Sequence, residues 1–176
     1  MSTIVPTSGS LHFSTRGEYG VRLMVELARH HGNGPVSLSE MADHEELPRP
    51  SLEQLLVSLR EAKLVTSTRG ARGGYELARP PEDIRMYEVI TALEGPITPM
   101  TCASADPEHR DLCSRAGCCN VEQLWQRVRD AIVEALDSMT LEELAAPTPG
   151  IPAHPEPALV AVKPLSHRTK EPVAQP

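Results

Sequence analysis

The chain has 176 residues, which suits one compact domain with appendages, and a formal net charge of −7. No apolar run approaches the roughly 18 residues of a membrane span, and the N-terminus lacks the basic and apolar pattern of a secretory signal. We therefore expect a cytoplasmic protein with no membrane partner. The acidic total disfavours non-specific binding to nucleic acid but leaves room for a local basic surface.

Apolar residues at helical spacing predict a first helix from Arg16 to about His31. Thr15 with Glu18 three residues later fits a capping box at its start. His30 and His31, at the other end, are expected to be solvated residues rather than metal ligands.

Two further helices are expected before residue 63. Ser37 with Glu40 repeats the capping-box pattern and opens a second helix that runs to about Glu45. Leucines at helical spacing predict a third helix over residues 49–62. Pro50 is tolerated only in the first turn of a helix and so fixes where this one begins.

A β-hairpin is expected to follow the third helix. Two short strands, residues 64–68 and 75–78, flank a glycine-rich turn. Three helices followed by a two-stranded wing describe a winged helix-turn-helix domain, which we place at residues 11–95. The fold class is therefore predicted to be mainly α.

The segment between residues 49 and 79 carries six basic and three acidic residues, a local positive strip on an acidic chain. In a helix-turn-helix domain, the first residues of the recognition helix meet base edges in the major groove. Glycines at the wing tip permit positive φ and close approach to the DNA backbone. The candidate DNA-binding residues are Arg49, Ser51, Glu53, Gln54, Arg69, Arg72, Gly73 and Tyr75.

A short helix is expected over residues 86–93. Residues 96–119 show no periodicity and contain all four cysteines, Cys102, Cys113, Cys118 and Cys119. In a reducing compartment, such a group indicates ligands or redox groups rather than disulfides. Thiolates favour zinc, copper(I) and iron–sulfur clusters. The spacing lacks the tight cysteine pairs of structural zinc sites.

Residues 120–145 are expected to form one long amphipathic helix, capped by Asn120 with Gln123. Residues 1–10, which are rich in Ser and Thr, are expected to be a flexible extension. Eight of the last thirty residues are proline, so residues 146–176 are predicted to be a disordered tail.

Over residues 11–145 the chain resembles the IscR/NsrR/RirA family of winged-helix regulators (the Rrf-two superfamily), and within it most of all the nitric-oxide-sensing NsrR branch. The matching stretches are residues 14–19, 51–55, 69–80 and 92–95, together with three cysteines before Leu124-Trp125. The resemblance implies a homodimer whose long C-terminal helices, here residues 120–145, cross. It also implies an iron–sulfur cluster that tunes operator binding.

The resemblance also implies which residues hold the cluster. The cysteines that match the family's three cluster ligands are Cys102, Cys113 and Cys119. Cys118 is an additional cysteine and a weaker candidate. In the nitric-oxide-sensing branch a carboxylate near the start of the first helix, from the other subunit, caps the cluster, and Glu18 falls at that position. Where another branch has a histidine ligand just after the third cysteine, this chain has Glu122.

We therefore predict a homodimeric DNA-binding regulator, a repressor, whose affinity for a double-stranded operator is switched by an iron–sulfur cluster. A four-iron cluster is favoured over a two-iron one, and the signal is nitric oxide, redox state or iron–sulfur supply. The alternative is a winged-helix regulator that uses zinc or thiol chemistry without a cluster. An enzyme is not expected, because the sequence has no HExxH, GxSxG, Walker A or GxGxxG motif.

Overall fold

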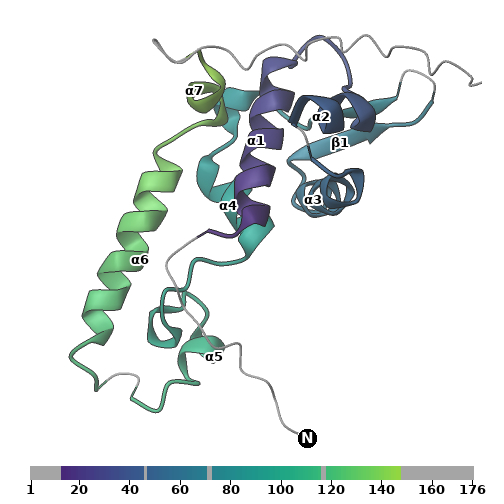
Figure 1. Cartoon of the computed structure of the whole chain (residues 1–176). Coiled ribbons are helices and arrows are strands. Elements are labelled where there is room, and N and C mark those ends of the chain that lie inside the picture. The colour runs from purple at the N-terminus through teal and green to yellow at the C-terminus, as the bar shows by residue number, and fades with distance from the viewer. Residues whose placement is uncertain (1–12, 46, 71–72, 116–117, 148–176) are drawn as a thin grey trace, which may run out of the picture.

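The computed structural model describes residues 13–45, 47–70, 73–115 and 118–147, so the predicted extension at residues 1–10 and nearly all of the tail lie outside it. A compact helical body with a two-stranded wing sits at one end of the molecule, and a single long helix, α6, runs away from it toward the cysteine-bearing segment (Figure 1). The winged-helix architecture predicted from the sequence is confirmed.

The first helix, α1 (Thr15–Arg29), begins one residue earlier than predicted. Ser14 is its N-cap, and the Ser14 hydroxyl accepts hydrogen bonds from the amides of Arg16 (3.2 Å) and Gly17 (3.4 Å). The predicted capping box between Thr15 and Glu18 is therefore wrong. Ser and Thr cap helices almost equally well, and Ser14 has a second partner, since its hydroxyl also donates to Glu94 at 2.6 Å.

The second and third helices are α2 (Leu38–Glu45) and α3 (Arg49–Glu61). The Ser37–Glu40 capping box is confirmed, with the Ser37 amide 2.8 Å from the Glu40 carboxylate and the Glu40 amide 3.2 Å from the Ser37 hydroxyl. Hydrogen bonds from the Ser37 amide and hydroxyl hold the pKa of Glu40 below its usual value.

The wing consists of β1 (Val65–Thr68) and β2 (Gly74–Leu77), paired antiparallel with Val65 opposite Leu77. The segment before α2 joins this hairpin, because Val36 and Tyr75 exchange two backbone hydrogen bonds of 2.9 and 2.8 Å. The wing is therefore attached directly to the helix-turn-helix.

The core lies between α1, α2, α3, the wing and α4 (Met86–Glu94), which follows the short 3₁₀ helix η1 (Pro81–Asp83). Its largest fully buried side chains are Leu23, Met24, Leu27, Met41, Leu52, Leu56, Leu59, Leu64, Ile84, Val89 and Leu141. These are the inward positions of the helical pattern, and few aromatic residues are needed to fill them. Helix α1 lies closely against α4, since a Cβ at Gly20 would fall 2.3 Å from the Leu93 side chain.

The C-terminal part differs from the prediction of one helix over residues 120–145. Helix α6 (Glu122–Asp137) follows Val121, so the Asn120 cap is wrong, and a separate helix, α7 (Leu141–Ala145), packs on α1. A new capping box between Thr140 and Glu143 starts α7, which is why the helix is interrupted. Residues 96–119 also contain two short turns of helix, η2 (Thr101–Ala103) and α5 (Pro107–Arg110).

The segment that leads out of the wing meets the break between α6 and α7. The amide of Met86 donates to the carbonyl of Met139 (3.0 Å), and the amide of Leu141 donates to the carbonyl of Ile84 (2.9 Å). The break between α6 and α7 is thus fixed to the start of α4, whose other end leads into the cysteine segment. Within the described residues, no helix has the combined length and apolar character needed to cross a bilayer.

Candidate functional site

The predicted DNA-reading residues of α3 lie at its N-terminal end. Arg49, Glu53 and Gln54 are exposed, and Ser51 is half-buried. Pro48 caps the helix without a side-chain hydrogen bond, and Leu52 behind them is fully buried in the core. The first turn of α3 is therefore held rigidly by its buried face while its polar face remains open to a ligand.

The wing contributes backbone geometry as well as charge. Arg69 is exposed near its tip, whereas Arg72 lies outside the described residues. A Cβ at Gly73 would lie 2.2 Å from the Thr68 carbonyl oxygen, so the tight turn requires glycine there. Tyr75 is half-buried and packs partly against the core, and its backbone is paired with Val36. The structure thus gives Tyr75 a supporting role in the wing.

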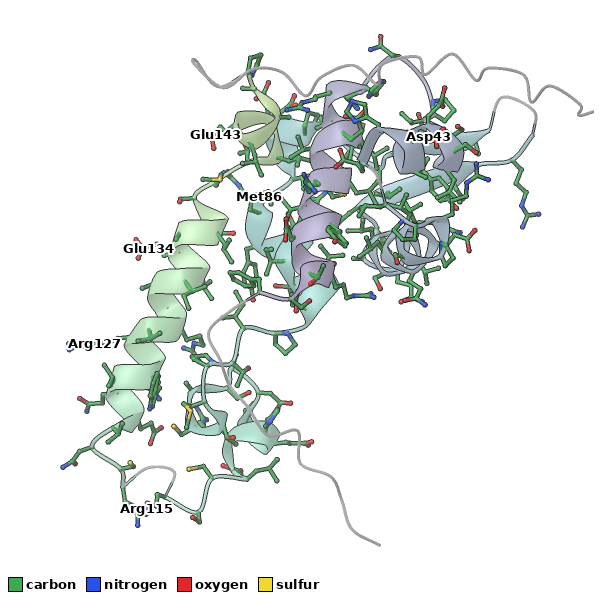
Figure 2. All side chains as sticks on the ribbon, in the orientation of Figure 1. Asp43, Met86, Arg115, Arg127, Glu134 and Glu143 are labelled. Carbon is green, nitrogen blue, oxygen red and sulfur yellow. The ribbon has the colours of Figure 1, made fainter. Side chains whose placement is uncertain are left out.

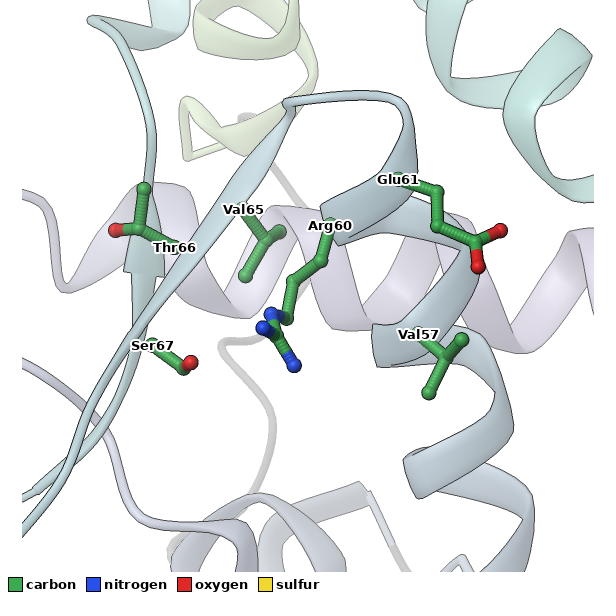
Figure 3. A pocket seen from close by; sticks show the side chains of 6 residues that line it. All are labelled: Val57, Arg60, Glu61, Val65, Thr66 and Ser67. Carbon is green, nitrogen blue, oxygen red and sulfur yellow. The ribbon is translucent and has the colours of Figure 1, made fainter.

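Arg60, which counted toward the basic strip but was not among the predicted site residues, lies near the C-terminal end of α3 and faces the wing. It lines a surface hollow together with Val57, Val65 and Ser67 (Figure 3). The same side chain borders a second hollow on the wing side, next to Arg69. Two guanidinium groups therefore flank the surface between the recognition helix and the wing.

The three predicted cysteine ligands come from different parts of the segment after α4. Cys102 lies in η2 and is only 8% exposed, Cys113 follows α5, and Cys119 precedes α6. Cys118 is exposed. Sulfur atoms of this part of the chain lie between α5 and the start of α6 (Figure 2).

The electrostatics of Cys102 show which groups surround it. Burial raises the pKa of the Cys102 thiol, and the nearby Cys113, Glu122 and Cys119 raise it further. The structure therefore brings together the three matched cysteines and one carboxylate. Glu122, the first residue of α6, is the member of this group that the sequence did not single out as a ligand.

The spacing of the thiols bears on what they can hold. Among the described residues, Cys102, Cys113 and Cys119 do not lie within 4.8 Å of one another, which is the closeness that three ligands of a single ion need. A cluster of several metal ions separates its thiolate ligands more widely than one ion does. The donor set, three soft thiolates and a carboxylate, is compatible with a polynuclear iron–sulfur group.

An arginine fixes the position of the Cys102 turn. Arg129 on α6 donates to the carbonyl of Ala103 at 2.8 Å, and the same guanidinium contacts Asp130. This hydrogen bond ties the Cys102 turn to the middle of α6.

Polar contacts also link the end of α4, which leads into the cysteine segment, to α1 and the recognition helix. Arg16 on α1 donates through Nε to the carbonyl of Leu93 (2.9 Å) and through a terminal nitrogen to the hydroxyl of Ser58 on α3. Ser14 binds Glu94, the last residue of α4, through both its amide and its hydroxyl. Residues of the two matched stretches, 14–19 and 92–95, thus join α1, α3 and α4 directly ahead of the cysteines.

Glu18 is exposed on α1. Its side chain is thus accessible to a second subunit.

Helix α6 has an apolar side that is not buried by the chain itself. Leu124 is 54% exposed, the flanking residues Val121 and Met139 are also exposed, and no residue of α6 is buried.

Comparison with known proteins gives consistent matches. Residues 13–147 match the Rrf2 family, described as iron-dependent transcriptional regulators. CymR of Bacillus subtilis is 44% identical over 141 residues, covering 80% of this chain and 94% of the relative. The solved structure of CymR, described as the global cysteine regulator of Bacillus subtilis, superposes on this chain with a TM-score of 0.62. The superposition covers 77% of this chain and 97% of CymR.

Two further solved structures are similar. IscR of T. potens is 41% identical, with a TM-score of 0.60 over 77% of this chain and 86% of the other. The oxidised form of CymR from Staphylococcus aureus is 38% identical, with a TM-score of 0.60 over 78% and 98% of the two chains. These relatives are transcriptional regulators, not enzymes.

Proposed function

The chain belongs to the Rrf2 family of DNA-binding transcriptional regulators, and from this premise we propose that an iron–sulfur cluster bound by Cys102, Cys113 and Cys119 sets its affinity for an operator. The observation that carries the proposal is the convergence of Cys113, Cys119 and Glu122 on the buried Cys102. When bound, such a group supplies a redox-active and nitric-oxide-reactive centre, and a four-iron form is favoured over a two-iron form.

Two carboxylates are candidates for a fourth ligand. Glu122 lies beside Cys102 within the same chain, whereas the exposed Glu18 would reach the cysteines of the other subunit of a dimer. Replacing each by glutamine separates them, because loss of the true ligand is expected to change the electron-paramagnetic-resonance spectrum of the reduced, paramagnetic cluster.

The protein's own residues provide a route from the cysteines to DNA. Arg129 holds the Cys102 turn against α6, and the Ser14 and Arg16 contacts hold the end of α4 against α1 and α3. A displacement of the cysteine segment would reach the end of α4 through the chain itself and α3 through the Arg16 contacts. A coupling free energy of about 1–3 kcal/mol would change operator affinity about 5- to 150-fold.

DNA binding is assigned to the first turn of α3 and to the wing. Arg49 and Gln54 offer guanine- and adenine-reading groups at the exposed end of α3, and Arg69 offers a phosphate or minor-groove contact. The exposed apolar side of α6 is the surface for the second subunit, which would set two recognition helices about 34 Å apart on one face of the operator.

The test is the ultraviolet–visible spectrum of anaerobically purified protein, recorded with the parent, Cys113→Ala and Cys118→Ala. We expect a visible absorption band in the parent and in Cys118→Ala, and its loss in Cys113→Ala. Bleaching by nitric oxide, with a parallel change in operator affinity, would support nitric oxide as the signal. Full absorbance in Cys113→Ala would remove that residue from the ligand set.

The alternative is a regulator that senses through thiols or zinc. The exposed Cys118 next to Cys119 favours this alternative. So does the similarity to CymR of Bacillus subtilis, described as a global cysteine regulator, and to the oxidised form of CymR from Staphylococcus aureus. A colourless protein after anaerobic reconstitution with iron and sulfide, combined with oxidant-dependent operator binding, would establish this alternative.

A further inference from the structure

Two glutamate side chains are buried in the winged domain, away from the cysteines. Glu26 lies on α1 and Glu45 ends α2, and the side chain of each is only 6% exposed. Buried carboxylates are costly unless their charge is balanced. The recorded contacts of these two carboxylates are with basic groups at 3.3–3.7 Å, longer than ordinary hydrogen bonds.

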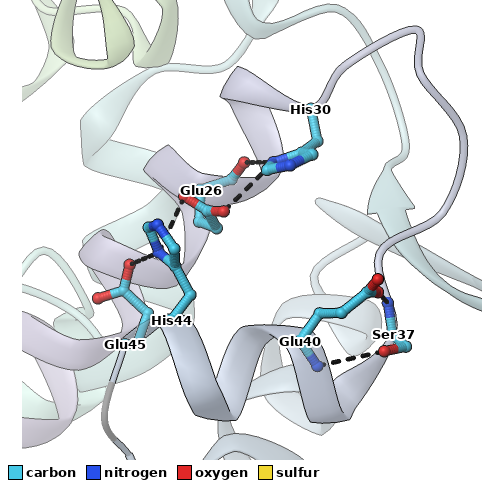
Figure 4. Close-up of polar contacts among 6 residues, drawn as sticks. All are labelled: Glu26, His30, Ser37, Glu40, His44 and Glu45. Carbon is cyan, nitrogen blue, oxygen red and sulfur yellow. Dashed lines mark hydrogen bonds and ion pairs between the residues drawn. The ribbon is translucent and has the colours of Figure 1, made fainter. Parts of the chain in front are cut away.

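A histidine lies between the two carboxylates. Nδ1 of His44 is 3.5 Å from one oxygen of Glu26 and 3.6 Å from one oxygen of Glu45 (Figure 4). The three ligand atoms all lie within 4.8 Å of one another. Glu26 and His44 belong to different helices, so tertiary packing of α1 on α2 creates this group.

These separations fit metal coordination. Bonds of 2.0–2.2 Å in a tetrahedral zinc site place neighbouring ligand atoms about 3.3–3.6 Å apart. We propose that Glu26, His44 and Glu45 bind a divalent transition-metal cation of the zinc class. Two positive charges would balance both carboxylates while His44 stays neutral, which is the form that binds metal.

The surroundings provide outer contacts. His30 Nδ1 is 3.3 Å from the other carboxylate oxygen of Glu26, and Arg22 Nε is 3.7 Å from the second oxygen of Glu45. Such contacts orient ligand carboxylates. The His44 side chain is 26% exposed although its Nδ1 atom is buried, so the site lies just beneath the surface. His30, expected to be solvated, thus contacts the ligand group.

The position suggests what the cation does. It would join the C-terminal half of α1 to the end of α2, directly before the turn into the recognition helix. Metal occupancy would therefore stabilise the helix-turn-helix itself. The site shares no residue with the cysteine segment, so it does not depend on the proposed cluster.

The test is thermal unfolding of the full chain with and without Zn²⁺, for the parent, His44→Gln, Glu45→Gln and the matched control His31→Gln. His31 is an exposed histidine of the same domain. At a Zn²⁺ concentration of about 100 times its dissociation constant, we expect the midpoint to rise by about 5–10 °C in the parent and in His31→Gln. The His44→Gln and Glu45→Gln variants should lose the part of the rise in unfolding midpoint that this site contributes.

Co²⁺ provides a second readout that separates this site from the cysteines. A nitrogen–oxygen site gives weak visible bands, whereas thiolate ligation adds intense near-ultraviolet absorption. We expect the parent to bind one equivalent of Co²⁺ without thiolate absorption. His44→Gln should lose this binding. An unchanged Zn²⁺ shift in a folded His44→Gln, or Co²⁺ spectra of the thiolate type alone, would overturn the proposal. If His44→Gln fails to fold, Glu45→Gln and the parent Co²⁺ spectrum decide.

Discussion

Gly74 shows how one missing side chain positions the wing. A Cβ at this residue would lie 2.3 Å from the carbonyl oxygen of Val36. Val36 belongs to the segment before α2 whose backbone pairs with the hairpin. Gly74→Ala is therefore expected to lower the free energy of unfolding by about 1–3 kcal/mol through steric strain. Chemical denaturation measures this change.

The control for Gly74→Ala is Ser67→Ala on the neighbouring strand. Ser67 is exposed, so its replacement should change stability by no more than about 0.5 kcal/mol. Equal stabilities of the two variants would show that the wing adjusts to a methyl group at residue 74 without strain.

Arg60 is expected to contribute to DNA affinity through phosphate attraction. Arg60→Ala should weaken operator binding across sequences and lower the slope of log affinity against log salt by about 1. Fluorescence anisotropy over a salt series measures both effects. Arg127→Ala on α6 removes an exposed arginine that points away from the wing (Figure 2). If it reduces the slope as much as Arg60→Ala does, the effect is one of net charge only.

Among elements, the contact between α1, α3 and α4 is expected to control communication. Arg16→Ala removes the hydrogen bonds to Leu93 and Ser58, so the ratio of operator affinities with and without the cluster should fall toward one. Binding titrations of both forms measure that ratio. Thr15→Ala, at an exposed neighbouring position, should leave it unchanged. If Arg16→Ala keeps the same ratio of operator affinities as the parent, coupling follows another route.

The elements of the winged domain were predictable because each has a clear local signal. The leucine spacing of α3 and the Ser37–Glu40 box placed two helices correctly, and the glycine-rich turn placed the hairpin. The break before α7 was missed because the apolar pattern continues to Met139. Its signal, the Thr140–Glu143 capping box, is readable in the sequence but was overridden by that periodicity.

The sites were only partly predictable. The cysteines and the exposed residues of α3 could be named from their types and positions. Glu122 as a neighbour of Cys102 depends on how the irregular segment folds back on α6. The pairing of Glu26 with Glu45 was not foreseeable either, because it depends on the packing of α1 against α2, and a glutamate within a helix is ordinarily solvated.

For the whole molecule, dimerisation should depend on the apolar side of α6. Leu124→Asp places a charge in the exposed apolar surface and is expected to shift the protein from dimer to monomer. Operator affinity should fall with it, because the two half-sites are then bound separately. Sedimentation velocity measures the mass. Gln123→Asp, at an adjacent exposed polar position, should remain dimeric; a dimeric Leu124→Asp would place the interface elsewhere.

The chain leaves the winged body after α4, which packs in its core, and returns to it at Met139–Leu141, where backbone hydrogen bonds join it to Ile84 and Met86 at the start of α4. The stretch between α4 and Met139, with the cysteines and α6, is therefore arranged like an insertion that is anchored to the body at the two ends of α4. Its length and ligands can change during evolution without displacing the part that reads DNA. One DNA-reading scaffold can thus acquire different sensors by exchange of this stretch alone.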